Sequence, residues 1–230
     1  MRAILLAGGM GTRLRSVVRD VPKPMAPVAG RPFLSHLLDY LEGQGIDEVV
    51  LSVGYLRQVI IDTIGNRHCG ISIRYALEDE PLGTGGGLRK AMERVSGFPV
   101  FALNADTLVH VDYRGMLRQQ EQAGGNLSIA LRAVDDTARY GSATVEGGRI
   151  VRFAAAEQPG LPGLINAGVY LFGENILQKG LPPVFSFERD FLEPKIGELK
   201  PLAFVADGYF IDIGVPDDYA RAQTELAAPR

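Results

Sequence analysis

The sequence predicts an α/β protein built on a mixed, mostly parallel β-sheet. Two observations lead to this prediction. In the first half of the chain, short apolar runs alternate with amphipathic stretches, which is the pattern of parallel strands joined by crossover helices. In the second half, strand-like segments follow one another and Gly147-Gly148 resembles a hairpin turn, so antiparallel strands should complete the sheet. The 230 residues contain no linker or repeat, and one domain is expected.

The first half of the chain supplies strands and helices in alternation. The helix of residues 33–44 is the clearest, because Phe33, Leu37 and Leu41 recur at helical spacing and Gly45 ends the pattern. The expected strands are residues 3–7, 48–53, 71–76 and 100–103, and the other helices are residues 56–64 and 86–95.

The second half is expected to be richer in strands. A helix of residues 113–123 precedes them. The expected strands are residues 127–133, 143–146, 150–154, 165–172, 202–205 and 209–213, with a loop at 159–163. The last expected element is a helix of residues 216–226, because Pro216, Asp217 and Asp218 suit the first turn of a helix.

Composition excludes several classes of partner. Hydrophobic residues make up 46% of the chain and charged residues 22%, and the net charge of −3 offers no general attraction to nucleic acid or to an anionic membrane. Cys69 is the only cysteine and cannot form an internal disulfide, which is typical of a reducing compartment. With no convincing targeting or membrane-spanning segment, a cytoplasmic protein is expected. A homodimer is the commonest oligomeric state and is the expectation here.

The glycine-rich segment LAGGMGTRL, residues 6–14, favours a phosphate-binding loop. A dinucleotide-binding loop would have a third glycine where Leu14 stands and an acid after the second strand, and both are missing. A P-loop requires a Gly-Lys pair, which the chain lacks. The segment does offer consecutive backbone N–H groups and Arg13, and Lys23 follows between two prolines that limit its motion. A loop of this kind can wrap a triphosphate group.

Residues 6–14 and the following Pro-Lys-Pro resemble the signature of the sugar-1-phosphate nucleotidylyltransferases. Later segments agree with that family in order and spacing: EPLGTGG at 80–86, NAD at 104–106, RYG at 139–141, NAG at 166–168 and IDIG at 211–214. The resemblance covers nearly the whole chain and implies one nucleotidyltransferase domain over residues 1–230, with a Rossmann-like, three-layer α/β sandwich. Residues 21–34, 80–88 and 185–192 are most similar to the D-glycero-D-manno-heptose 1-phosphate guanylyltransferases.

The resemblance implies an enzyme of nucleotide-sugar biosynthesis, for capsule or surface polysaccharide. Its substrates would be a nucleoside triphosphate, favoured to be GTP, and a sugar 1-phosphate, and its products a nucleotide-diphospho-sugar and pyrophosphate. Arg13, Lys23 and Asp106 would be catalytic, and Asp106 and Asp212 would bind Mg²⁺, a hard cation that takes carboxylates, phosphate oxygens and water. Arg13 would lie against the leaving pyrophosphate.

The nucleotide site is expected to combine two glycine-rich loops. By resemblance its residues are Leu6, Ala7, Gly8, Gly9, Gly11, Thr12, Arg13, Glu80, Gly83, Thr84 and Gly85. A carboxylate beside the base weakly favours guanine, whose N1–H and N2–H₂ are donors, over uracil or thymine. Either Glu78 or Glu80 could accept from them, and a surface acid is an equally good interpretation of this acidic cluster.

The sugar phosphate is expected to lie across a second set of residues. By resemblance these are Lys23, Gly141, Glu157, Asn166 and Glu188. The family often has Glu-Lys-Pro where this chain has Gln158 in the middle position, so one phosphate-binding lysine is missing. Lys23 and Arg13, or Lys179 or Lys195, would then balance that phosphate.

Three other functions compete with this hypothesis. A uridylyl-, thymidylyl- or cytidylyltransferase acting on a hexose 1-phosphate would keep the same chemistry. A non-catalytic nucleotide-sugar sensor of the same fold would not need Arg13, Lys23, Asp106 and Asp212 together. An NAD-dependent enzyme would bind NADH, which the loop analysis argues against. A protein that carried acetyltransferase activity as well would need a hexapeptide-repeat extension, which is not seen here.

Overall fold

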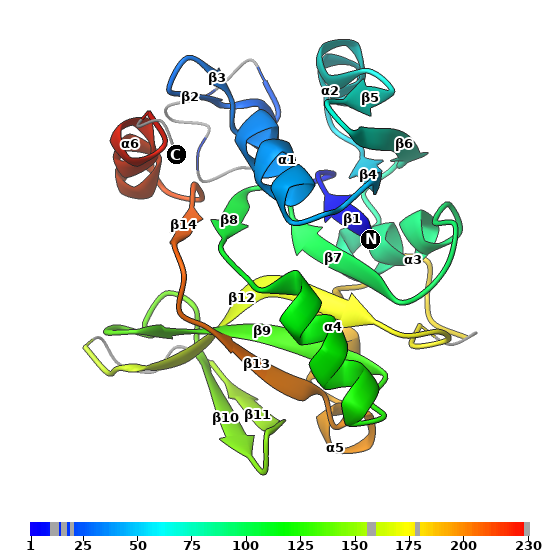
Figure 1. The fold of residues 1–230 in the computed structure, drawn as a ribbon, viewed down its shortest axis with the longest axis vertical. Coiled ribbons are helices and arrows are strands. Elements are labelled where there is room, and N and C mark those ends of the chain that lie inside the picture. The colour runs from blue at the N-terminus through cyan, green and yellow to red at the C-terminus, as the bar shows by residue number, and fades with distance from the viewer. Residues whose placement is uncertain (10–13, 15–17, 19–20, 156–159, 178–179, 228–230) are drawn as a thin grey trace.

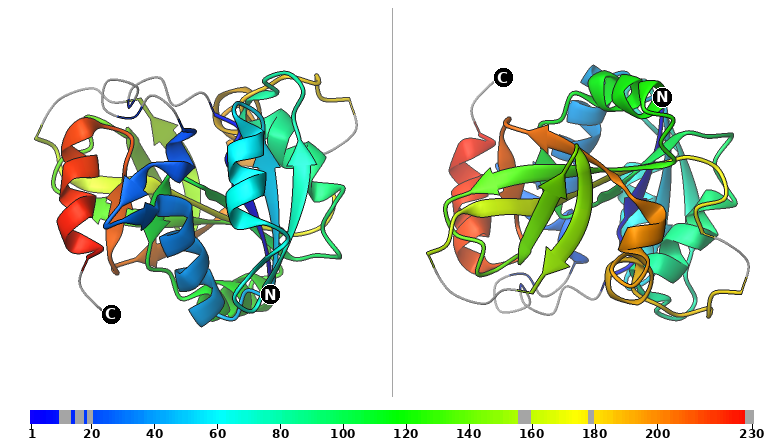
Figure 2. Two further views of the ribbon diagram at one scale, coloured as in Figure 1. Left: turned by 90° about the horizontal axis from the view of Figure 1, so that it is seen from above. Right: turned by 90° about the horizontal axis from the view of Figure 1, so that it is seen from below.

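A computed structural model describes residues 1–230 apart from 10–13, 15–17, 19–20, 156–159, 178–179 and 228–230. In this part of the chain, ten strands form one sheet in the order β10-β11-β13-β9-β12-β7-β1-β4-β6-β5, with helices against both faces (Figures 1 and 2). The predicted α/β fold on a mixed sheet is confirmed.

The first half of the sheet is parallel. Strand β1 pairs in parallel with β4 and β7, β4 pairs with β6, and the short β5 runs antiparallel at the edge. Their bounds are β1 Arg2–Leu6, β4 Glu48–Val53, β5 Arg67–His68, β6 Ile71–Leu77 and β7 Val100–Asn104. β1, β4 and β7 are buried over most of their length, as expected for strands covered on both faces. The alternation predicted from the sequence is therefore confirmed here.

The second half of the sheet is mostly antiparallel. Strand β12 joins the two halves, since it runs antiparallel to both β7 and β9. The bounds are β9 Leu127–Val134, β10 Ser142–Glu146, β11 Arg149–Ala154, β12 Gly163–Phe172 and β13 Leu202–Ala206. Gly147 and Gly148 have positive φ angles of 54° and 74°, as the predicted hairpin turn between β10 and β11 requires.

Helices cover both faces of this sheet. One buried cluster takes apolar residues from α1, α2, α4 and α6, and the other takes them from α3 and η3. The bounds are α1 Phe33–Gly43, α2 Arg57–Ile64, α3 Gly83–Met92, α4 Tyr113–Gln122, α5 Ile196–Leu199 and α6 Pro216–Glu225, with η2 Lys23–Met25 and the π-helix η3 Phe187–Leu192. The two clusters lie on opposite faces of the sheet, which gives the three layers that were predicted. Among the described helices, none is long and apolar enough to cross a lipid bilayer.

Two small sheets lie beside the main one. Strands β2 (Pro27–Val28) and β3 (Arg31–Pro32) form a hairpin, and β8 (Thr107–Val109) pairs antiparallel with β14 (Phe210–Asp212). The strand expected at residues 209–213 therefore exists, but it pairs with β8, just after β7, and not with the main sheet. This pairing brings the last part of the chain to the end of β7 (Figure 1).

Candidate active site

A cavity of about 420 Å³ opens at the carboxyl end of the parallel strands. Leu6 ends β1, Asn104 ends β7 and Glu78 follows β6, and all three line it, in agreement with the usual place of ligand sites in open α/β sheets. Its other lining residues are Ala7, Gly8, Gly9, Leu14, Lys23, Pro24, Pro81, Gly83, Thr84, Asp106 and Gly214. Most of the residues assigned to the nucleotide from the sequence thus meet at one cavity.

Not every assigned nucleotide residue is found there. Gly11, Thr12 and Arg13 lie outside the described residues. Glu80 is exposed and is not among the lining residues, although it directly precedes Pro81, which is. Gly85 is buried behind the cavity, where its N–H donates to the Phe185 carbonyl at 3.0 Å.

Glu78 is the buried carboxylate of this cavity. Its side chain accepts a hydrogen bond from Ser52 Oγ at 2.7 Å and another from the Leu82 N–H at 3.2 Å. Ser52 belongs to β4, so the bond from its hydroxyl ties the loop after β6 to the neighbouring strand. Glu78 is only 7% exposed, and both of its oxygens already have partners in the protein. We infer that Glu78 organises the loop.

Two aspartates far apart in sequence converge beside the cavity. Asp106 follows β7, and Asp212 lies opposite Thr107 in the β8–β14 pair, where the Ile213 N–H also donates to the Asp106 carbonyl at 3.1 Å. The Asp106 and Asp212 side chains are 33% and 19% exposed, so both carboxylates remain open to small solutes. The short β8–β14 pairing is what builds this acidic pair.

The Lys23 ammonium lies between the two carboxylates. Its Nζ is 2.5 Å from Asp106 Oδ2 and 3.5 Å from Asp212 Oδ1, and its side chain is 11% exposed. Lys23 starts the short helix η2 between two prolines, and its carbonyl accepts from the Ala26 N–H at 3.0 Å. The two prolines that flank Lys23, as noted in the sequence, therefore hold its ammonium group against the acidic pair.

The acidic pair presents two carboxylates to one point in space. Two carboxylate oxygens lie within 3.5 Å of one nitrogen, so they can converge on a single cation. Mg²⁺ is held by one or two carboxylates and completes its shell with water and phosphate oxygens. The donor set of Asp106 and Asp212 fits this ion.

Arg139 is a site residue that the sequence reasoning missed. Its Nη2 is 2.6 Å from Asp212 Oδ2 and its Nη1 contacts Asp218 of α6, which in turn pairs with Arg221 at 3.0 Å. One guanidinium thus fixes the Asp212 carboxylate that also faces Lys23. The RYG segment was the available signal, but only its glycine had been assigned.

A hydrogen-bonded network connects the nucleotide loop to the sugar residues. Thr84 Oγ1 donates to Glu188 Oε2 at 2.7 Å, Tyr170 OH donates to Glu188 Oε1 at 3.0 Å, and Asn166 Nδ2 donates to Tyr170 OH at 2.9 Å. Burial, and then the neighbouring Glu188 carboxylate, raise the pKa of Tyr170 well above 10, so its hydroxyl stays protonated and remains a donor. Glu188 is therefore held by the first turn of α3 and by β12 together.

The other residues assigned to the sugar phosphate from the sequence do not line the cavity or lie outside the described residues. Gly141 precedes β10 and Asn166 lies on β12, and neither is among the residues that line the cavity. Lys195 has its Nζ 5.2 Å from the Phe191 ring centroid and also lies outside the lining. Glu157, Gln158 and Lys179 are outside the described residues.

The start of α3 depends on glycine. A Cβ on Gly85 would lie 2.1 Å from the ring of Phe185, which is itself buried, so there is no space for a side chain. We expect Gly85→Ala to destabilise the protein by about 1–3 kcal/mol, as overpacked cores do. Thermal unfolding checks this. As a matched control, Gly43→Ala adds the same methyl group to helix α1 in open space and should not lower the Tm. Equal Tm values for the two variants would contradict the packing argument.

An α/β sheet with a cavity at the carboxyl ends of its parallel strands is typical of nucleotide-binding enzymes, and the comparisons with known proteins point to one such family. The family of nucleotidyl transferases matches residues 2–228, and the chain belongs to this family. The D-glycero-alpha-D-manno-heptose 1-phosphate guanylyltransferase of Aneurinibacillus thermoaerophilus is 45% identical over 98% of each chain. The protein of the same name from Campylobacter jejuni is 40% identical over 95% of this chain and 97% of its own.

A solved structure resembles this protein over its whole length. HddC from Yersinia pseudotuberculosis, complexed with GMP-PN, superposes with a TM-score of 0.85 at 36% identity and covers 98% of this chain and 99% of its own. The predicted family is therefore confirmed, and the family match extends over residues 2–228.

Proposed function

We propose that this protein is a guanylyltransferase that joins GTP and D-glycero-α-D-manno-heptose 1-phosphate. The observation that carries the proposal is the convergence of Lys23, Asp106 and Asp212 beside a cavity that the nucleotide loops line. The choice of guanine and heptose is supported by the names of the two relatives that match almost the entire chain. The GMP-PN complex of HddC supports a guanine nucleotide in the same fold.

The reaction proposed is a displacement at phosphorus. A phosphate oxygen of the sugar 1-phosphate forms a bond to the α-phosphorus of GTP, and the bond from that phosphorus to the bridging oxygen of the β-phosphate breaks. GDP-heptose and pyrophosphate are the products. Both substrates are anions, so the protein must neutralise crowded phosphates and align the attacking and leaving oxygens.

The chain's own groups divide this task. The backbone around Gly8 and Gly9, with Arg13, would hold the triphosphate. Lys23 would contact the α-phosphate and the sugar phosphate. Asp106 and Asp212 would hold Mg²⁺, which when bound supplies positive charge for the phosphates. Arg139 would keep Asp212 oriented while that carboxylate exchanges Lys23 for another partner.

Guanine selection is assigned to Glu80, which is exposed and directly precedes the cavity-lining Pro81. Within the described part of the chain its carboxylate makes no hydrogen bond or ion pair, whereas both oxygens of Glu78 are engaged. A carboxylate that accepts from N1–H and N2–H₂ of guanine is correctly matched to that base.

We expect Glu80→Gln to lower the preference for GTP over ITP about tenfold, because ITP lacks the amino group and loss of a charged hydrogen bond costs about 1.5–3 kcal/mol. The ratio of kcat/KM values for the two nucleotides measures this. Asp79→Asn is the matched control, since its carboxylate is 80% exposed and pairs with Arg57. An unchanged ratio in Glu80→Gln, or an equal fall in Asp79→Asn, would refute the assignment.

A substrate panel tests the function itself. GTP, UTP, dTTP and CTP are each incubated with Mg²⁺ and with heptose or hexose 1-phosphates, and the nucleotide-sugar formed is identified by mass. The proposal expects GDP-heptose as the main product. Product only from UTP, dTTP or CTP would favour a uridylyl-, thymidylyl- or cytidylyltransferase, and binding of GDP-heptose without any turnover would favour a sensor.

The cellular setting of the enzyme follows from its proposed product. GDP-heptose would be a donor for capsule or other surface polysaccharide, made in the cytoplasm where GTP is available. The homodimer expected from the sequence remains a prediction.

A further inference from the structure

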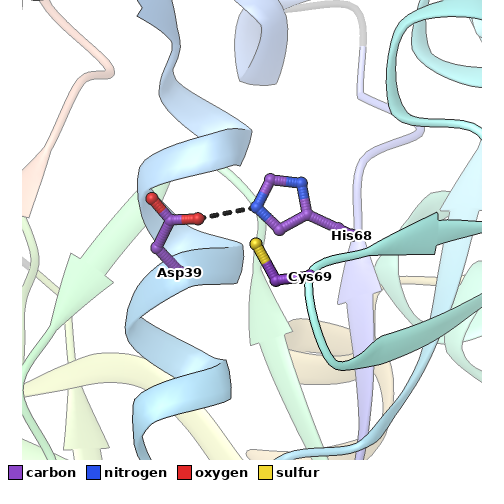
Figure 3. Close-up of side chains that lie close together, drawn as sticks. All are labelled: Asp39, His68 and Cys69. Carbon is purple, nitrogen blue, oxygen red and sulfur yellow. Dashed lines mark hydrogen bonds and ion pairs between the residues drawn. The ribbon is translucent and has the colours of Figure 1, made fainter.

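A second group of metal-ligating side chains lies away from the cavity. Asp39 lies on α1, His68 ends β5, and Cys69 follows it in the turn before β6. One ligand atom of each residue lies within 4.8 Å of the other two (Figure 3). None of the three lines the nucleotide cavity. The proposed function therefore leaves this cluster without a role.

The cluster is held together by contacts between the turn and the helix. His68 Nε2 lies 2.7 Å from Asp39 Oδ1, and the Gly70 N–H donates to Glu42 Oε1, one turn further along α1, at 2.9 Å. Cys69 has a positive φ of 47°, a conformation that side chains other than glycine seldom adopt and that here places its thiol on the same side as the imidazole (Figure 3). The turn is thus fixed against α1 before any ligand binds.

The chemistry of the three ligands selects a particular type of metal. Thiolate, imidazole and carboxylate together are typical of Zn²⁺, which binds sulfur, nitrogen and oxygen at about 2.0–2.3 Å, whereas Mg²⁺ takes oxygen ligands. Arg31 pairs with the other oxygen of Asp39, so Oδ1 is the oxygen directed at the cluster. Binding would release the thiol proton to solvent, and a water would complete the tetrahedron.

We propose that Asp39, His68 and Cys69 form a Zn²⁺-binding site that joins the β5–β6 turn to helix α1. The site is separate from the Asp106–Asp212 pair in both position and ligand type. The Cys69 and His68 side chains are accessible, since Cys69 is exposed and His68 is 18% exposed, so an ion can enter from solvent.

Co²⁺ is the probe, because it replaces Zn²⁺ in such sites and gives a thiolate-to-metal charge-transfer absorption that carboxylate sites lack. The full chain is titrated with Co²⁺ under a non-thiol reductant, and Zn²⁺ is then added. We expect one Co²⁺ per chain with the thiolate band, loss of the band on adding Zn²⁺, and a higher Tm with Zn²⁺. Because Cys69 is the only cysteine of the chain, the band reports this site alone.

Variants distinguish coordination of the metal by the three side chains from a general attraction of the cation to nearby negative charge. Cys69→Ser should abolish the band, and His68→Ala and Asp39→Asn should each weaken Co²⁺ binding at least tenfold. Glu42→Gln removes a nearby charge on the same helix but keeps an acceptor for Gly70 N–H, and it should bind as the wild type does. Absence of the band in the wild type, or equal weakening in Glu42→Gln and Asp39→Asn, would overturn the proposal. Because the readout is absorption, failure of nucleotidyl transfer would leave its result unaffected.

Discussion

Replacement of Asp106 by asparagine is expected to lower kcat about a thousandfold, because charge stabilisation by a bound metal is worth several kcal/mol and each 1.36 kcal/mol is tenfold in rate. Asparagine keeps the shape of the side chain but loses the charge that would hold Mg²⁺. The fold should persist, since the Asp106 side chain is 33% exposed and its backbone carbonyl still accepts from the Ile213 N–H. Steady-state pyrophosphate release measures the loss of kcat, and thermal unfolding shows whether the fold persists.

Asp212→Asn should cause a comparable loss of kcat, and it should also lower the stability of the fold. Asp212 also accepts from the Gly214 N–H at 2.7 Å and pairs with Arg139, so its removal leaves a guanidinium with one carboxylate partner fewer. Asp62→Asn is the control for both variants, because its carboxylate is exposed and, among the described residues, accepts a hydrogen bond only from Gln58 on α2. Asp106→Asn with more than a tenth of wild-type activity would contradict the assignment of this residue.

Lys23→Met is expected to lower kcat/KM by two to three orders of magnitude, the size found when a charged donor to a transition state is removed. Both kcat and KM should change, because the ammonium would contact phosphate in the bound substrate as well as in the transition state. Methionine has an unbranched apolar side chain of similar length, so it replaces the stem of Lys23, whose side chain is 11% exposed. Lys90→Met, made on helix α3 outside the cavity lining, should leave kcat/KM unchanged.

The same variant has a second consequence that does not involve turnover. Without Lys23, the two carboxylates face one another with no ammonium between them, so a divalent cation should stabilise Lys23→Met more than the wild type. The rise in Tm on addition of Mg²⁺ measures this difference. An equal rise in Lys23→Met and the wild type would show that Lys23 and the cation do not share the acidic pair.

Local patterns in the sequence predicted most of the main sheet and its helices. Strand β4 has the bounds expected from its continuous apolar run. Helix α1 ends one residue before its expected end, because apolar residues at helical spacing are a strong local signal. Helix α3 begins three residues earlier than expected. Its first turn is rich in glycine, which lowers helix propensity, and it is stabilised by contact with Phe185, far away in the sequence.

The site depended on information that local patterns do not carry. Strands β8 and β14 have three residues each, too few to show a period, yet their pairing is what brings Asp212 next to Asp106. From the sequence, only the family resemblance pairs these aspartates. The partners of Arg139, and the approach of Asp39 to His68, also arise from tertiary packing and had no sequence signal of their own.

Pyrophosphate release from GTP and D-glycero-α-D-manno-heptose 1-phosphate, measured for the wild type and for Asp106→Asn in the same assay, tests the central claim most directly. We expect sustained release that requires both substrates, GDP-heptose as the product, and about a thousandfold slower release by the variant. Absence of turnover in the wild type, or equal rates for the two proteins, would contradict it.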